Sequence, residues 1–323
     1  MSRLLLFTLI ITLAVPPAAA QSPKAEPPAK PWFVDDTKFF ADFMEKLTGF
    51  AKDGKCLGRE KLAEKMKSGT KAKVALSTKV RDKALTPEEI YKVALPSVFI
   101  VGTVYKDKEG DWLDGLYATA WVAAADGVLV SNWHVFEDLE QEEVFGVVDH
   151  KGNVYPVIDF LGGDKTADVA IFRIDAKGLT PLAVAEDYAA IGAWVGVLGH
   201  PGDNFYVYTT GAISRYSTNK SEDDKRERWM GLTAEYAGGS SGSPVLNRYG
   251  AVVGMAALTM TIEDGKKPPM PAPGRRVHRV KRDGPEIAPP PREVHPAHAA
   301  LPTVQMILKM AVPGPTIRKS FEK

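Results

Sequence analysis

The spacing of hydrophobic residues is helical near the start of the chain. From Thr37, apolar side chains recur at three- and four-residue steps, the period of an amphipathic helix; they are Phe39, Phe40, Phe43, Met44, Leu47 and Phe50. A second helix is expected over Arg59 to Lys67. A third is expected from Pro87, because Thr86 can cap it and Glu89 completes a capping box.

After Pro96 the pattern becomes that of strands. Short runs rich in Val, Ile and aromatic residues alternate with turn residues, and no long helical pattern separates them. This texture predicts an all-β barrel or sandwich. The runs are Ser97 to Tyr105, Tyr117 to Ala123, Val128 to Ser131, Val154 to Phe160, Val169 to Ile174, Trp194 to Leu198 and Val252 to Ala257.

These patterns divide the chain into segments. Residues 31–85 are expected to be a small helical region, and residues 86–312 the main β domain. The helical region is interpreted as a packing appendage, with a pro-segment or a partner-binding arm left as alternatives. Within the main domain, residues 261–297 are rich in proline and basic residues, which resist packing, so an exposed loop insertion is expected there.

The chain beyond this loop regains an apolar rhythm. The spacing from Leu301 to Met310 is helical, and Pro313 and Pro315 would end such a helix. Residues 313–323 are expected to be a tail.

The first residues have the pattern of an export signal. Arg3 precedes an apolar run from Leu4 to Val15, and small residues follow at Ala18 to Ala20. The run is too short to span a bilayer as a helix. We therefore expect a signal peptide over residues 1–20 and a linker over 21–30, with an uncleaved membrane anchor as the alternative. A bacterial periplasmic or secreted protein without membrane attachment after cleavage is expected.

Charge and cysteine content exclude several classes of partner. The formal net charge is +1, which argues against nucleic acid as a partner, because neutralising phosphates needs an excess of Lys and Arg. Cys56 is the only cysteine, so an intramolecular disulfide and a zinc site of several thiolates are excluded. His295 and His298 lie in the proline-rich loop without acidic or thiol partners and are interpreted as solvated. No metal or cofactor is expected, and the oligomeric state is not indicated.

Three segments combine the residue types of nucleophilic catalysis. His134 follows a short apolar strand, Asp168 stands at the head of another, and Ser241 lies in a glycine-rich loop. A serine hydroxyl needs a neighbouring base, which a histidine supplies when a carboxylate holds its tautomer. Attack on a carbonyl also needs two backbone N–H groups for the oxyanion. Here the candidates for these are the amides of Gly239 and Ser241.

The motifs around these residues resemble those of the trypsin-like peptidases of the HtrA (Deg) type. The order His, Asp, Ser is that of the chymotrypsin-like fold. The T-N-x-H-V motif is matched by Ser131 to Val135, D-[LIV]-A by Asp168 to Ala170, and G-N-S-G-G-P by Gly239 to Pro244. The resemblance covers about residues 86–312. It implies a double β-barrel with the triad His134, Asp168 and Ser241 in the cleft, and endopeptidase activity on polypeptides through an acyl-enzyme.

The chain also departs from that pattern. Ala118 and Ala120 replace glycines of the family's G-S-G-F segment, and the rival hydroxyls of Ser240 and Ser243 flank Ser241. Nothing resembling a PDZ module follows, so substrate delivery and cage assembly are not implied. Two alternatives therefore stay open: a catalytically silent binding protein with a protease fold, and a zymogen activated by removal of the N-terminal helices.

Substrate preference has two indications. Met255, Ala256 and Ala257 should align with the strand that edges the specificity pocket, and their size favours small or medium apolar side chains. Glu235, six residues before Ser241, is a candidate for the pocket floor, where it would favour Lys or Arg; a loop salt bridge or a solvent-facing position is the alternative. The proline-rich loop is rooted beside this pocket and is a candidate gate for substrate entry.

Overall fold

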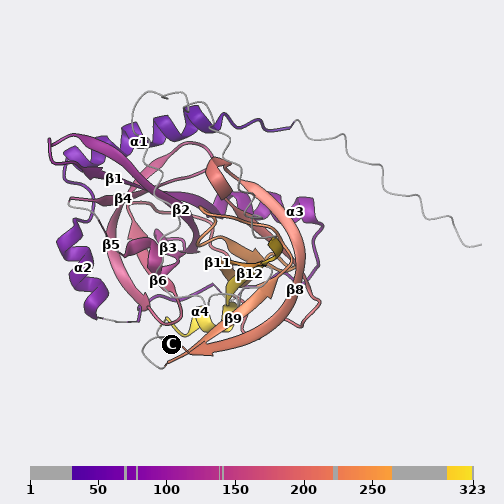
Figure 1. Ribbon diagram of the computed structural model, residues 1–323. Coiled ribbons are helices and arrows are strands. Elements are labelled where there is room, and N and C mark those ends of the chain that lie inside the picture. Colours follow the sequence, from indigo (N-terminus) through magenta and orange to yellow (C-terminus); the bar gives the residue numbers. More distant parts are fainter. Residues whose placement is uncertain are drawn as a thin grey trace, which may run out of the picture. The chain divides into compact units, whose positions relative to one another are not determined.

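The computed structural model describes residues 31–68, 71–77, 79–137, 139, 142–220, 225–263 and 304–321. The helices and strands of these described residues all lie within Val34–Lys323, which forms one compact unit. The α-helices in the described parts are α1 (Asp36–Lys52), α2 (Arg59–Ser68), α3 (Pro87–Ala94) and α4 (Gly314–Arg318) (Figure 1). None of these helices has the length and apolar character needed to cross a bilayer.

The first six strands close into an antiparallel barrel. They are β1 (Val98–Lys106), β2 (Trp112–Ala124), β3 (Val128–Ser131), β4 (Val144–Val148), β5 (Val154–Asp164) and β6 (Val169–Ile174). Their order around the barrel is β1-β2-β3-β6-β5-β4, and β4 pairs back onto β1. Alternate side chains of the strands point inward, so Phe99, Leu129, Phe145 and Phe172 fill the interior together with Phe136, which follows β3.

The remaining strands close a second barrel. They are β7 (Trp194–Gly199), β8 (Val207–Lys220), β9 (Arg226–Leu232), β10 (Pro244–Leu246), β11 (Val252–Glu263) and β12 (Val304–Pro313). The order is β10-β11-β12-β9-β8-β7, with β7 paired to β10. The expected all-β, chymotrypsin-like double barrel with a helical N-terminal extension is thus confirmed.

The N-terminal helices pack against the barrels. Phe43, Met44 and Leu47 of α1 are buried. Two strand glycines make this contact possible: a Cβ at Gly102 of β1 would lie 2.5 Å from the Phe43 ring, and one at Gly146 of β4 would lie 2.4 Å from Leu47. The three predicted helices are confirmed, including the capping box of α3. The division proposed between residues 85 and 86 stays a prediction.

The predicted helix from Leu301 to Met310 is wrong. The residues described there form β12, which pairs with β11 along its length and with β9 at Lys309, Met310 and Ala311. The second barrel needs this strand to close, and tertiary pairing overrides a short apolar rhythm. Thr261 to Glu263, the first residues of the expected loop, belong instead to β11. Residues 264–303 lie outside the described part of the chain.

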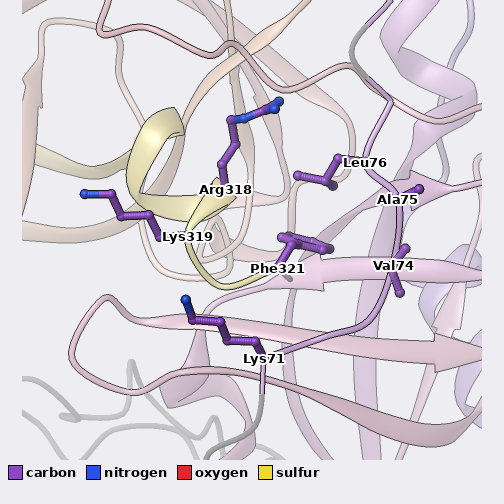
Figure 2. Close-up of a pocket in the computed structure, with 7 residues that line it drawn as sticks. All are labelled: Lys71, Val74, Ala75, Leu76, Arg318, Lys319 and Phe321. Atoms are coloured by element: carbon purple, nitrogen blue, oxygen red, sulfur yellow. The ribbon is translucent and has the colours of Figure 1, made fainter. Parts of the chain in front are cut away.

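The tail expected over residues 313–323 is also wrong for the part that the structure describes. Gly314–Arg318 forms α4, and Ile317 and Phe321 are buried. Phe321 forms an isolated bridge with Ala72. A pocket lies beside this bridge and is lined by both segments (Figure 2). The apolar lining residues are Val74, Ala75, Leu76 and Phe321, and the basic ones are Lys71, Arg318 and Lys319. Ile317 and Phe321 are thus part of the core.

Candidate active site

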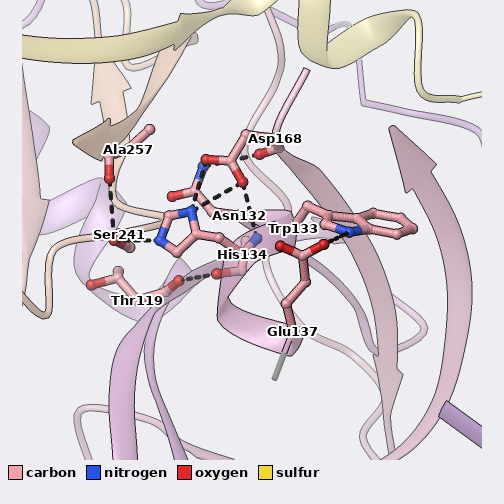
Figure 3. A network of polar contacts seen from close by, with 9 residues as sticks. Thr119, Asn132, Trp133, His134, Glu137, Asp168, Ser241 and Ala257 are labelled. Atoms are coloured by element: carbon pink, nitrogen blue, oxygen red, sulfur yellow. Dashed lines mark hydrogen bonds and ion pairs between the residues drawn. The ribbon is translucent and has the colours of Figure 1, made fainter. Parts of the chain in front are cut away.

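Two paired strands of the first barrel position His134 and Asp168. Ser131, at the end of β3, lies opposite Ala170, near the start of β6. His134 follows β3 in the short 3-10 helix η2 (Trp133–Phe136), and Asp168 directly precedes β6. Figure 3 shows the resulting contact. The Nδ1 atom of His134 lies 2.9 Å and 3.0 Å from the two carboxylate oxygens of Asp168.

Backbone contacts fix the orientation of the Asp168 carboxylate. The N–H of His134 donates to Oδ1 of Asp168 at 3.0 Å. Asp168 has a left-handed φ of 56°, which is uncommon outside glycine. The Asn132 side-chain amide holds this conformation by donating to the Asp168 carbonyl at 3.0 Å. Asn132 is part of the motif around His134, but no role was predicted for it.

Ser241 completes the contact from the second barrel. Its Oγ lies 3.0 Å from Nε2 of His134 and 3.3 Å from the carbonyl oxygen of Ala257 (Figure 3). The hydroxyls of Ser240 and Ser243 are buried and have no hydrogen-bond partner among the described residues. Of the three neighbouring serines, Ser241 is therefore the one that contacts the histidine.

The serine loop presents free backbone donors. Gly239 and Gly242 have φ values of 90° and 91°, which favour glycine. Within the described residues, no protein acceptor takes the N–H of Gly239 or of Ser241. Thr119 of β2 anchors the loop, because its hydroxyl donates to the Gly239 carbonyl at 3.0 Å. This role was not predicted, since the sequence does not indicate which strand of the other barrel faces the loop.

The electrostatics favour a charged His134 during a reaction. Burial lowers the pKa of His134, but the charge of Asp168, its hydrogen bond and the charge of Glu137 outweigh this, so the pKa lies above the ordinary 6.5. Glu137 accepts a hydrogen bond from Trp133 Nε1 at 3.0 Å and pairs with Lys165. An imidazolium formed here would thus be stabilised by two carboxylates.

Other titratable candidates lack this environment. Burial lowers the pKa of His200 to about 3, and its Nδ1 accepts a hydrogen bond from the N–H of Tyr206, so this imidazole is neutral. Burial raises the pKa of the Cys56 thiol to about 11, which leaves little thiolate at neutral pH. In the described ranges, no three His, Cys, Asp or Glu side chains form a group that could hold a metal ion. His295 and His298 lie outside those ranges.

Glu235, one of the residues expected at the substrate pocket, takes part in an ion pair. Glu235 has a side chain that is 73% exposed, and it pairs at 3.0 Å with the buried ammonium of Lys309. Lys309 also donates to the carbonyl of Tyr236 at 2.6 Å. Glu235 therefore forms the loop salt bridge that was its alternative role, and its charge already has a partner.

The predicted pocket strand lies beside the serine loop. Met255 and Ala257 belong to the cluster between the barrels, and Ala256 lies in the core of the second barrel. The backbone of Ala256 exchanges hydrogen bonds with Gly242 and Ser243. The strand is thus held against the loop that carries Ser241, which is the placement that a pocket edge requires.

Comparison with known proteins supports the class indicated by the fold. Residues 118–255, less than half of the chain, match the family described as trypsin-like peptidase domain. The two closed barrels agree with this match, and the resemblance to trypsin-like peptidases of the HtrA type is confirmed.

Two of the similar proteins are named as bacterial serine proteases. A probable periplasmic serine endoprotease DegP-like of Chlamydia muridarum is 32% identical over 143 residues, which are 44% of this chain and 28% of that protein. A putative serine protease HhoB of Synechocystis is 28% identical over 145 residues, 42% of this chain and 33% of that protein. The chain thus spans about a third or less of the length of these relatives.

Proposed function

We propose that this chain is a serine endopeptidase that cleaves polypeptides through Ser241, His134 and Asp168. The observation that supports this most is the continuous set of short contacts from the Asp168 carboxylate through both ring nitrogens of His134 to the Ser241 hydroxyl. A serine, a base and an orienting carboxylate at hydrogen-bond distance are the parts that acyl transfer requires.

The reaction proceeds in two displacements. Ser241 Oγ attacks the carbonyl carbon of the scissile bond, and its proton passes to Nε2 of His134. The N–H groups of Gly239 and Ser241 donate to the oxyanion. The C–N bond then breaks, and His134 returns the proton to the leaving amine. Water repeats the sequence on the acyl-enzyme ester, which restores the Ser241 hydroxyl.

The chain is further proposed to act in the periplasm or outside a bacterial cell. The charged start and apolar run of residues 1–20 support this, although that segment lies outside the described residues. The Chlamydia relative is itself named as periplasmic. Determination of the N-terminus of the exported protein tests the proposal, and a mature chain that begins near Gln21 is the expected result.

Labelling with a fluorophosphonate tests the proposed chemistry. The wild-type protein should be labelled, Ser241→Ala should not, and Ser243→Ala, which removes a neighbouring buried hydroxyl, should retain labelling. Hydrolysis of an unfolded protein should follow the same order. If the folded wild-type protein is not labelled, the proposal of an active enzyme fails, and the silent binding protein and the zymogen take its place.

A further inference from the structure

An aromatic cluster links helix α1 to the loop that carries Ser241. The Phe40 ring of α1 meets the Tyr117 ring of β2 edge-on, with centroids 6.2 Å apart. It also stacks on Phe205, which follows β7, at 6.0 Å. Tyr117 and Phe205 meet edge-on at 6.3 Å. Three segments that lie far apart in the sequence therefore share one contact.

The Tyr117 ring also packs against Gly239 of the serine loop. A Cβ placed on Gly239 would lie 2.3 Å from Cε2 of Tyr117 and 2.3 Å from the carbonyl oxygen of His200. The ring and this carbonyl thus pack directly against the Gly239 backbone. Since the N–H of Gly239 is a proposed oxyanion donor, Tyr117 forms part of the wall that sets its direction.

The loop between β7 and β8 also packs against Gly239, through the His200 carbonyl, and it is held by contacts with α1. Asp203 and Tyr206 in this loop have left-handed φ values of 61° and 59°, a costly conformation that needs outside support. Asp36 at the start of α1 accepts a hydrogen bond from the N–H of Phe205 at 3.0 Å. Tyr117 accepts one from the N–H of Asp203 at 2.8 Å through its hydroxyl.

The same loop is tied to the serine loop by its backbone. The N–H of Gly202 donates to the carbonyl of Gly238 at 2.8 Å. Gly238 directly precedes Gly239, so a shift of the β7–β8 loop would be transmitted to the proposed oxyanion donor. Helix α1 therefore supports Gly239 along two routes: through the Tyr117 ring, and through the loop that Asp36 and Phe40 hold.

We infer that α1 is a permanent positioning element of the oxyanion hole, in which Phe40 acts through Tyr117 on Gly239. This inference rests on the proposed endopeptidase function. It assigns a role to the N-terminal region that is opposite to that of an inhibitory pro-segment: loss of the α1 contact lowers the catalytic rate. Phe40 and Tyr117 are positioning residues, because neither takes part in the bond changes.

Substitution of Phe40 in the full-length chain tests the inference. Phe50→Ala is the matched control, because Phe50 lies on the same helix, is half-buried like Phe40, and its ring contacts Lys55. For Phe40→Ala, we expect kcat on a peptide ester to fall about 10- to 100-fold with KM changed less than about threefold, since one oxyanion donor is misdirected. Inhibition by a peptide aldehyde, whose adduct places an oxyanion in the hole, should weaken in parallel.

Two further measurements separate this role from loss of folding. Phe40→Tyr keeps the ring and should retain kcat within about threefold of wild type, while Phe40→Leu keeps apolar volume without the edge-on contact and should follow Phe40→Ala. Circular dichroism establishes that each assayed variant is folded, and Phe40→Leu serves if Phe40→Ala does not fold. Folded Phe40→Ala or Phe40→Leu protein with the kcat of Phe50→Ala would overturn the inference. Absence of fluorophosphonate labelling in wild type would instead overturn the proposed function.

Discussion

Thr119 of the first barrel holds Ser241 of the second, because its N–H donates to the Ser241 carbonyl at 2.8 Å. Its hydroxyl also donates to the carbonyl of Gly239 at 3.0 Å. The strand that carries Thr119 pairs with β3, which leads to His134. The nucleophile's loop is therefore fixed to the barrel that supplies the base, and the two halves of the site are aligned by the backbone and by side chains alike.

Replacement of Asp168 should change both the rate and its pH dependence. Asp168→Asn removes the charge that raises the pKa of His134 but leaves the burial that lowers it. The base form of His134 is the neutral one, so wild-type activity should fall as the pH drops through a pKa above 6.5. In Asp168→Asn, this acid limb should move to lower pH, and kcat should drop about 10⁴-fold.

A pH profile of kcat/KM on an activated ester measures both effects. Asp126→Asn removes an exposed carboxylate that pairs with Arg173 and should leave the profile unchanged. An acid limb that stays in place in Asp168→Asn would contradict the assigned coupling.

A side chain at Gly239 should strongly lower kcat. In Gly239→Ala, the added Cβ would meet the His200 carbonyl and the Tyr117 ring at 2.3 Å, so the loop must shift. We expect kcat to fall at least about 10²-fold, the effect of losing one oxyanion donor. Gly152→Ala is the control, because Gly152 also has a positive φ, of 81°, but open space around its Cα. Activity of Gly239→Ala equal to that of Gly152→Ala would contradict the proposed role of the Gly239 backbone.

Glu235 should not select basic substrates. Its carboxylate is paired with Lys309, so a substrate Lys or Arg would have to displace an existing ion pair. Glu235→Gln should change the preference for Arg over Ala before the scissile bond by less than about threefold, because the exposed carboxylate is already paired with Lys309. Glu186→Gln, which removes a similarly exposed carboxylate paired with Arg318, is the control. A tenfold loss of Arg cleavage in Glu235→Gln alone would restore the pocket-floor role.

The C-terminal segment should contribute to stability. Phe321 is 4% exposed, and its replacement by Ala leaves a cavity against the chain at Ala72. Phe321→Ala should lower the free energy of unfolding by about 3–5 kcal/mol. Tyr249→Ala truncates an aromatic side chain that is 41% exposed and should cost much less. Equal midpoints in guanidinium chloride would mean that the segment is dispensable.

The parts of the fold that sequence analysis predicted are those with a local signal. The strands β3 and β6 are mostly apolar runs, and two residues of the site lie beside them: His134 shortly after β3 and Asp168 directly before β6. The capping box at Thr86 is likewise complete within four residues. Each of these features depends on neighbours in the chain, so the pattern alone indicates it.

The parts that were missed depend on distant partners. The strand β8 has a polar sequence and partly exposed side chains, so no apolar period marks it. The residues of β12 were predicted to form a helix because their own sequence does not indicate the pairing with β11 and β9. The pairing of Glu235 with Lys309 joins residues that only barrel closure brings together.

The place of β12 in the chain has a consequence for biosynthesis. Ser241 is synthesised well before Val304–Pro313, yet the second barrel closes only when this strand inserts between β9 and β11. A nascent chain that already contains all three residues of the proposed triad therefore still lacks the barrel that orients the serine loop. Under the proposed function, the serine loop can therefore become competent for catalysis only after Val304–Pro313 has been synthesised and paired.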